Sequence, residues 1–274
     1  MKRSFSPLLA LGLAAFLCSC SVFYSKSAGY YPPKGNCTRI VTYNVGTFTK
    51  SGTNRLKMVA DMMKELDADI ICLNELDSCT SRTHKSYQLK TFAREMGRWN
   101  YAFTRAIPFQ GGSYGIGIAC KPSLRIRDSW SLSLERGRGG EQRALSVVEF
   151  DRMVVAATHL DHKSESARID QARTISAALK ARYASSGKTV VLSGDFNDTP
   201  SSRVLEELRR DWTVISETRP TYDSSKPRHC IDYILVLNGS GSPRIKRSAV
   251  CTHFEQGDVT LASDHLPVYA DLKP

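Results

Sequence analysis

The sequence predicts an α/β sandwich, in which a mixed β-sheet or two packed sheets are covered by helices. Nearly continuous apolar runs at 39–45, 69–76 and 189–194 are typical of strands that are buried on both faces. A long helix is predicted over 164–184, where apolar residues recur at helical spacing. The apolar runs between 114 and 160 follow one another without a helix, which favours a mixed sheet. No G-x-G-x-x-G follows the first run, which excludes a doubly wound dinucleotide-binding fold.

The other elements follow from the same patterns. The remaining predicted strands cover 114–120, 124–134, 143–150, 153–160, 231–237 and 266–272, and the remaining helices 54–66, 86–97 and 202–210. We expect Asp198 or Thr199 to cap the last of these helices. With 274 residues, 41% of them apolar, the chain is long enough for one large domain or two small ones.

The first residues are typical of an export signal. Lys2 and Arg3 precede an apolar stretch at 7–17, which is too short to span a bilayer. The stretch ends in the tetrapeptide LCSC, which looks like a bacterial lipobox and makes Cys20 the expected lipidated residue. A plain secretory signal cut nearby is the alternative interpretation.

The lipobox interpretation divides the chain into three parts. Residues 1–20 are the signal, 21–37 a tether and 38–274 the folded domain. We therefore expect an exported monomer that is lipid-anchored to a bacterial membrane, on its periplasmic or cell-surface side. The formal net charge of +11 falls to about +9 without the signal and favours an anionic partner, such as a phosphorylated metabolite, a lipid headgroup or nucleic acid.

Cysteine spacing argues against a structural metal site. None of the eight cysteines forms a C-x-x-C pair, so zinc and iron–sulfur sites are not expected. Cys72 and Cys120 lie in apolar runs and are expected in the core. Export would permit disulfides, but the sequence gives no pairing.

Polar residues cluster where the predicted strands begin or end. These residues are Asn44, Glu75, His159, Asp161, Asp195, Asn197, Asp232, Asp264 and His265. If the pleat continues past Asp195, then Asp195 and Asn197 point to one side and Phe196 into the core. If the last two strands run antiparallel to the others, every cluster reaches the same edge. The sequence therefore predicts one polar site.

The residue types in these clusters suit phosphoester chemistry. Glu75 and Asp264 are hard oxygen donors and Asn44 a neutral one, a set that suits Mg²⁺ or Mn²⁺. Asp232 and His265 form a plausible carboxylate–imidazole pair, in which the acid orients the ring.

Two further residues complete this prediction. His159 could stabilise charge that builds on phosphorus, and Asn197 could orient a substrate or an attacking water. Asp161 and His162 could equally face solvent.

The stretches TYN, NE, THLDH, GDFN, IDYI and SDHLPV occur in an order that resembles the endonuclease/exonuclease/phosphatase superfamily. This group contains pancreatic deoxyribonuclease, abasic-site endonucleases, sphingomyelinases and inositol-polyphosphate 5-phosphatases. The resemblance covers roughly residues 40–270, nearly the whole mature chain. It implies a four-layer α/β sandwich like that of deoxyribonuclease I, with two packed mixed sheets flanked by helices.

The resemblance also implies roles for individual residues. Glu75 would be the principal metal ligand, with Asn44 and Asp264 beside it. His265, paired with Asp232, would be general base or phosphate contact.

Other roles carry over in the same way. Asp195 is the competing candidate for activating water, and this assignment stays open. His159 would bind phosphate, Asn197 would orient the substrate, and Arg143 matches an arginine often found before that strand. Asn74 departs from the pattern, because Gln commonly precedes the glutamate.

We expect a Mg²⁺-dependent hydrolase of phosphoric esters, with Mn²⁺ as a possible substitute. Its substrate would be a phosphodiester or phosphomonoester of the headgroup, inositol phosphate or nucleotide type. The alternatives are an extracytoplasmic nuclease acting on DNA or RNA, and a lipid-anchored binding protein that has lost turnover. A dinuclear metallophosphoesterase is excluded, because the chain contains neither D-x-H nor N-H. We expect the loops at 106–114 and 135–143 to set specificity.

Overall fold

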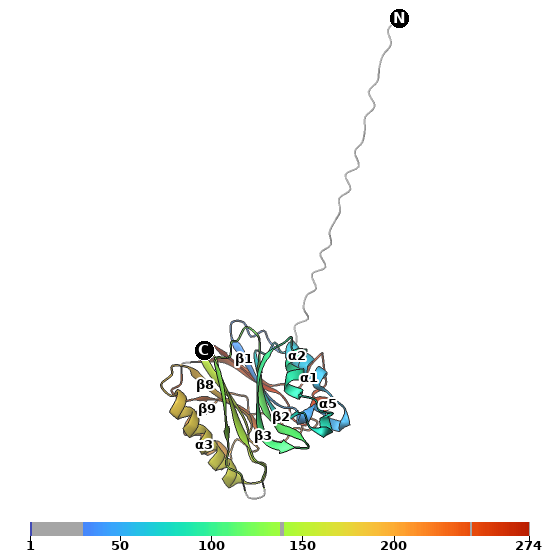
Figure 1. Cartoon of the computed structure of the whole chain (residues 1–274). Coiled ribbons are helices and arrows are strands. Elements are labelled where there is room, and N and C mark those ends of the chain that lie inside the picture. Colours follow the sequence, from blue (N-terminus) through green and yellow to red (C-terminus); the bar gives the residue numbers. More distant parts are fainter. Residues whose placement is uncertain (2–29, 138–139, 242, 274) are drawn as a thin grey trace.

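The computed structural model describes Met1 and residues 30–137, 140–241 and 243–273 (Figure 1). The predicted signal after Met1, with Cys20, and residues 21–29 of the predicted tether lie outside this part. Two six-stranded sheets pack face to face, and helices cover the outer face of each. The predicted four-layer α/β sandwich is confirmed.

The first sheet has the strand order β11-β12-β1-β2-β4-β3. Its strands are β1 (Thr38–Asn44), β2 (Ile70–Ser78), β3 (Asn100–Phe109), β4 (Gly112–Cys120), β11 (Arg244–Val250) and β12 (Val268–Lys273). Strand β1 is parallel to β2 and antiparallel to β12. The helices α1 (Leu56–Glu65), α2 (Gln88–Glu95) and α5 (Val259–Ala262) lie on one side of the sandwich, as Figure 1 shows.

The second sheet has the order β5-β6-β7-β8-β10-β9. Its strands are β5 (Asp128–Ser133), β6 (Ala144–Glu149), β7 (Met153–His159), β8 (Thr189–Asp195), β9 (Trp212–Val214) and β10 (Asp232–Leu237). Strand β7 is parallel to β8, and β10 is antiparallel to β8. The helices α3 (Glu165–Tyr183) and α4 (Arg203–Arg209) cover this sheet.

Three apolar layers hold the sandwich together, one between the sheets and one under each set of helices. Cys72 and Cys120 lie in the layer between the sheets, as predicted. All six cysteines from Cys37 onward are free in the described chain. Within the same part of the chain, no helix is long and apolar enough to cross a membrane.

The predicted cap of α4 is wrong. Ser202 caps this helix, since its side chain accepts a hydrogen bond from the Leu205 N–H. Asp198 instead pairs with Arg168, whose Nε lies 2.9 Å from Oδ2 of Asp198. The acid therefore joins the loop after β8 to helix α3 and does not begin α4.

Residues 30–37 pack against the domain. The ring of Tyr31 lies beside Phe254 and Tyr269. Arg39 donates to both carboxylate oxygens of Asp271, at 2.7 and 2.8 Å, and also to the carbonyl of Pro32. The folded unit thus includes the end of the segment that the sequence suggested as a tether.

Replacing Arg39 should cost much of the domain's stability. Its side chain is 2% exposed, and Arg39→Ala leaves the buried Asp271 with only Arg247, whose Nε lies 3.6 Å from Oδ2. Removing one member of a buried ion pair costs about 3–5 kcal/mol in free energy of unfolding. Urea denaturation measures this loss.

The matched control is Lys64→Ala, which removes an exposed partner of Asp61. Exposed pairs contribute at most about 1 kcal/mol. Equal losses in the two variants would show that the Arg39 pair does not stabilise the fold.

Candidate active site

The strand directions bring the predicted polar clusters to one end of the sandwich. The parallel pairs β1–β2 and β7–β8 end there, and the antiparallel strands β10 and β12 begin there. His159 and Asp232 stand opposite Asp195 in the register of the second sheet. An open cavity of about 360 Å³ lies at this end. We call it the cleft; its lining residues are Glu75, Tyr114, Glu141, Arg143, His159, His162, Asp195, Asn197, Tyr222, Ile231, Asp264 and His265.

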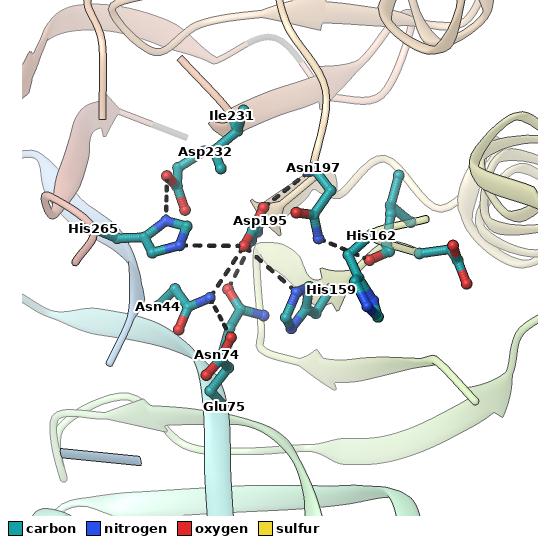
Figure 2. A network of polar contacts seen from close by, with 12 residues as sticks. Asn44, Asn74, Glu75, His159, His162, Asp195, Asn197, Ile231, Asp232 and His265 are labelled. Carbon is teal, nitrogen blue, oxygen red and sulfur yellow. Dashed lines mark hydrogen bonds and ion pairs between the residues drawn. The ribbon is translucent and has the colours of Figure 1, made fainter. Parts of the chain in front are cut away.

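Asp195 is the centre of the polar network (Figure 2). Its Oδ2 accepts a hydrogen bond of 3.1 Å from the Asn44 amide. The Nε2 atoms of His159 and His265 lie 3.5 and 3.6 Å from the same oxygen. Its Oδ1 accepts the backbone N–H of Asn197 at 2.9 Å. Burial raises the pKa of Asp195 to about 7, although the charge of His265 opposes this shift.

His265 is held by a second carboxylate. Its Nδ1 lies 2.9 Å from Oδ2 of Asp232, which also accepts a 2.6 Å hydrogen bond from the Thr221 hydroxyl. Burial alone would lower the pKa of His265, but Asp232 and Asp195 outweigh it and raise the pKa to about 10. The ring therefore carries a proton on each nitrogen at neutral pH. Nδ1–H faces Asp232, and Nε2–H faces Asp195.

A β-bulge aims Glu75 into the cleft. The pairing of β2 with β4 shifts between Leu73 and Leu76, so Asn74 and Glu75 share a single place in the register. Glu75 adopts a φ of 59°, in the left-handed region that non-glycine residues avoid. The alternation of the strand is broken there, and the carboxylate lines the cleft while Asn74 is fully buried.

Asn74 joins the two sheets at the site. Its amide donates to the carbonyl of Thr158 at 2.8 Å, and its Oδ1 accepts the backbone N–H of Asp195 at 3.2 Å. These bonds fix the ends of β7 and β8 against β2. The sequence marked Asn74 only as a departure from the superfamily pattern, and this bridging role was not predicted.

Arg143 lies directly before β6 and is 4% exposed. Its guanidinium donates to Glu141 at 2.9 Å and lies 3.5 Å from Nδ1 of His159 and 3.2 Å from Nδ1 of His162. Burial and the Arg143 charge hold the pKa of His159 well below its usual range. A neutral His159 accepts from Arg143 through Nδ1 and presents Nε2–H to Asp195.

Asn197 lines the cleft, but the strand pleat that was predicted to place it there does not continue past Asp195. Strand β8 ends at Asp195, and Asn197 has a φ of 52°. Its side-chain amide donates to the carbonyl of Leu160 at 3.0 Å. Phe196 is buried in the core, as predicted. The amide group of Asn197 is thus oriented by the end of the neighbouring strand.

Asp161 does not face solvent. It is fully buried, and its Oδ1 accepts the backbone N–H groups of Lys163 and Ser164 before α3. His162, by contrast, is exposed and contacts Arg143. Asp161 therefore shapes the loop after β7, and His162 belongs to the cleft.

Several lining residues were not predicted individually. Tyr114 lies in β4 and Glu141 in the loop before β6, inside the segments 106–114 and 135–143 that the sequence marked for specificity. The segment 106–114 was predicted as a loop, but most of it belongs to β3 and β4. Tyr222 had no sequence signal, and its ring lies 5.0 Å from that of His265. Its place in the cleft depends on the fold of the loop before β10.

The predicted metal ligands lie at the open side of the network. Glu75 and Asp264 are half-buried and line the cleft. Asn44 donates to Glu75 at 3.0 Å, and its Oδ1 accepts the N–H of Gly46. Hard, partly exposed carboxylate oxygens fit a hydrated Mg²⁺ or Mn²⁺ ion.

A buried cluster offers a second set of possible ligands. Among the described residues, Asp195, Asp232 and His265 place ligand atoms within 4.8 Å of one another. These atoms already bind one another, and Asp232 lies behind His265. Glu75 and Asp264 therefore fit a divalent ion better.

Asn74→Ala should destabilise the junction of the sheets. It removes the hydrogen bonds of Asn74 to the Thr158 carbonyl and the Asp195 N–H, two buried groups, at about 1–3 kcal/mol for each. Urea denaturation measures the loss. The control Asn238→Ala removes an exposed hydrogen bond from Thr213 and should change stability by no more than about 0.5 kcal/mol. An unchanged unfolding midpoint in Asn74→Ala would contradict the bridging role.

Solved structures share this fold across most of the chain. A mannosyl-6-phosphatase from Bacteroides thetaiotaomicron is 18% identical, with a TM-score of 0.72, and covers 86% of this chain and 100% of its own. An endonuclease/exonuclease/phosphatase protein from Bacteroides vulgatus is 21% identical, with a TM-score of 0.69 and coverage of 86% and 98%. A 2′,3′-cyclic phosphatase is 13% identical, with a TM-score of 0.68 and coverage of 86% and 95%. At these identities the likeness establishes the fold.

Sequence comparison adds the family. No curated protein sequence matches the chain. The model of the Endonuclease/Exonuclease/phosphatase family matches residues 41–265, which include every polar cluster of the cleft. Because this match spans most of the sequence, the chain belongs to the endonuclease/exonuclease/phosphatase family.

Proposed function

We propose that this protein is a divalent-metal-dependent hydrolase of phosphoric esters. The observation that carries the proposal is the buried carboxylate of Asp195, which has two imidazoles within 3.6 Å at the floor of an open cleft. Oxygen donors at the cleft, Glu75 and Asp264, suit a hard cation. Family membership supports the same reaction class.

Asp195 is the group that we assign to activate water. Its oxygens are held by Asn44 and by the backbone of Asn197, so the carboxylate keeps one orientation. It can accept the proton of a water molecule that attacks phosphorus. A divalent ion held by Glu75 and Asp264, with Asn44 beside them, would supply positive charge to the phosphoester oxygens.

The imidazoles and Arg143 would bind the phosphate group. His265 is charged and fixed by Asp232, so it can donate to an oxygen on which negative charge builds. Neutral His159 keeps its Nε2–H directed into the same space, and Arg143 orients its ring. Asn197 can orient the attacking water or a substrate oxygen.

Two of the structural neighbours suggest a range of possible substrates. One is a mannosyl-6-phosphatase, and another is a 2′,3′-cyclic phosphatase. The proposal therefore includes monoesters and diesters of the sugar phosphate, headgroup, inositol phosphate or nucleotide type. We further propose that the protein is exported and attached to a membrane through Cys20. The LCSC tetrapeptide after the apolar stretch supports this.

The first test uses the soluble form that begins at Ser21, which keeps the described domain from Tyr30 onward. It is assayed with Mg²⁺ and with EDTA on a phosphodiester, a phosphomonoester, sphingomyelin, an inositol polyphosphate and supercoiled plasmid. We expect turnover that EDTA abolishes, and the preferred substrate identifies the subclass. Preference for plasmid would establish the nuclease alternative.

Glu75→Ala should abolish both turnover and metal binding, because it removes the main oxygen donor at the cleft. Activity assays and titration calorimetry with Mg²⁺ measure the two effects. Glu206→Ala is the matched control, since this exposed glutamate lies on α4 away from the cleft. Near-full activity in Glu75→Ala would refute the metal assignment.

Asp195→Asn should separate chemistry from metal binding. The amide keeps the shape of the carboxylate but cannot accept the proton, so kcat should fall by at least about 100-fold. Calorimetry should still detect the metal, because Glu75 and Asp264 remain. Asp211→Asn, a surface change at the partner of Lys180, is the control. A variant that kept its kcat would exclude Asp195 as the base.

A further inference from the structure

A second cavity lies at the end of the sandwich opposite the cleft. It has a volume of about 380 Å³, and we call it the basal cavity. Both sheets line it, since Thr38 begins β1, Met153 begins β7 and Lys273 ends β12. Asn44 and His159, at the other ends of β1 and β7, belong to the polar site. The length of the strands therefore separates the two cavities.

The basal cavity combines cations with apolar walls. Arg125, Arg152 and Lys273 are exposed around it, and none of them forms an ion pair within the described ranges. Its one acid, Asp151, is paired with Arg127. The rest of the lining is apolar (Leu124, Phe150 and Met153) or uncharged and polar (Asn36, Thr38 and Ser123). Such a lining suits a phosphate group that is joined to an apolar body.

The charge around the basal cavity is positive because its acids are neutralised. Acidic side chains on the surrounding strand ends and turns form ion pairs: Asp67, Asp69, Asp128, Glu149, Asp151 and Asp271. The lining of the cleft has the opposite balance, with four carboxylates from Glu75, Glu141, Asp195 and Asp264 against the two cations Arg143 and His265. An anionic surface is therefore attracted more strongly to the basal cavity than to the lining of the cleft.

An exposed apolar side chain continues this surface. Ile245 is 40% exposed on β11, which is an edge strand of the first sheet. Its neighbours Arg244 and Lys246 are exposed and form no ion pair in the described chain, and Arg244 pairs with Lys273 in the register. With the cations around it, Ile245 gives this edge one apolar contact for a membrane interface that basic residues attract.

The chain also enters the fold at this end. Asn36 lines the basal cavity, and Lys34 pairs with Asp69 directly before β2. Cys20, the proposed lipid attachment, lies ten residues before Tyr30. Ten extended residues span at most about 36 Å, so a lipid at Cys20 would keep the domain close to the membrane.

We propose that the basal end of the sandwich docks on a membrane surface that contains anionic phospholipids. A lipid phosphate occupies the basal cavity, Ile245 contacts the interface, and the cleft faces away from the bilayer. Basic residues near such a surface are each attracted to it, and salt weakens the attraction. This inference goes beyond the proposed hydrolysis, because docking requires no turnover. Substrates would then reach the cleft from the aqueous side, so the headgroups of the docked membrane itself would not be among them.

Vesicle sedimentation tests the proposal with the soluble form that begins at Ser21. Vesicles of phosphatidylcholine with phosphatidylglycerol should bind the protein, and vesicles of phosphatidylcholine alone should not. Binding should weaken as salt rises. Glu75→Ala should bind as well as the unchanged protein, so failure of the catalytic proposal leaves this test intact.

A triple variant, Arg125→Ala, Arg152→Ala and Lys273→Ala, should lower vesicle binding by at least about tenfold. The control triple, Lys57→Ala, Lys90→Ala and Arg203→Ala, removes the same charge from exposed helix positions. It should change binding by less than about twofold. Equal losses in both variants, absence of binding to the anionic vesicles, or equal binding to phosphatidylcholine would overturn the proposal. So would binding of free glycerol phosphate without binding of vesicles.

Discussion

The structure depends most on the burial of one carboxylate, Asp195, at the junction of the two sheets. A buried charge is costly unless it is paired and hydrogen-bonded. Its carboxylate partners come from both sheets, with Asn44 from the first and His159 from the second, and Asn74 of the first sheet accepts the backbone N–H of Asp195. His265 completes the set from the segment before β12. The carboxylate is therefore satisfied only when the sheets are packed, and the fold and the site form together.

The site also contains strained backbone. Glu75 and Asn197 both have positive φ values, and each such residue costs about 1–3 kcal/mol. The bulge in β2 sends Glu75 to the cleft and leaves Asn74 inside to bridge the sheets. A regular strand would direct these two side chains to opposite faces and could not serve both roles. The three apolar layers of the sandwich offset this cost.

The sequence predicts the buried strands and the polar residues at their ends, because both depend on local patterns. It misses the edge strands β3, β9 and β11. These strands are only partly buried, so their sequences show no clear apolar pattern. The first four residues of β11, for example, are exposed. The bridge through Asn74 and the place of Tyr222 depend on which segments meet in space. Periodicity carries no such information, so the polar residues at the strand ends were predictable, and the contacts of Asn74 and Tyr222 were not.

The cleft residues that lie away from the strand ends also explain why the reaction class is easier to infer than the substrate. Strand ends fix the groups that would handle phosphate, whereas Glu141 and Tyr222 come from loops and Tyr114 from β4. The guanidinium of Arg143 already contacts the Glu141 carboxylate and the imidazoles of His159 and His162. An incoming phosphate must compete with that carboxylate, so binding depends on how much charge the substrate and its metal ion bring together. In the proposed hydrolase, discrimination between esters would rest on Glu141, Tyr114 and Tyr222, which can change without altering the residues that surround Asp195.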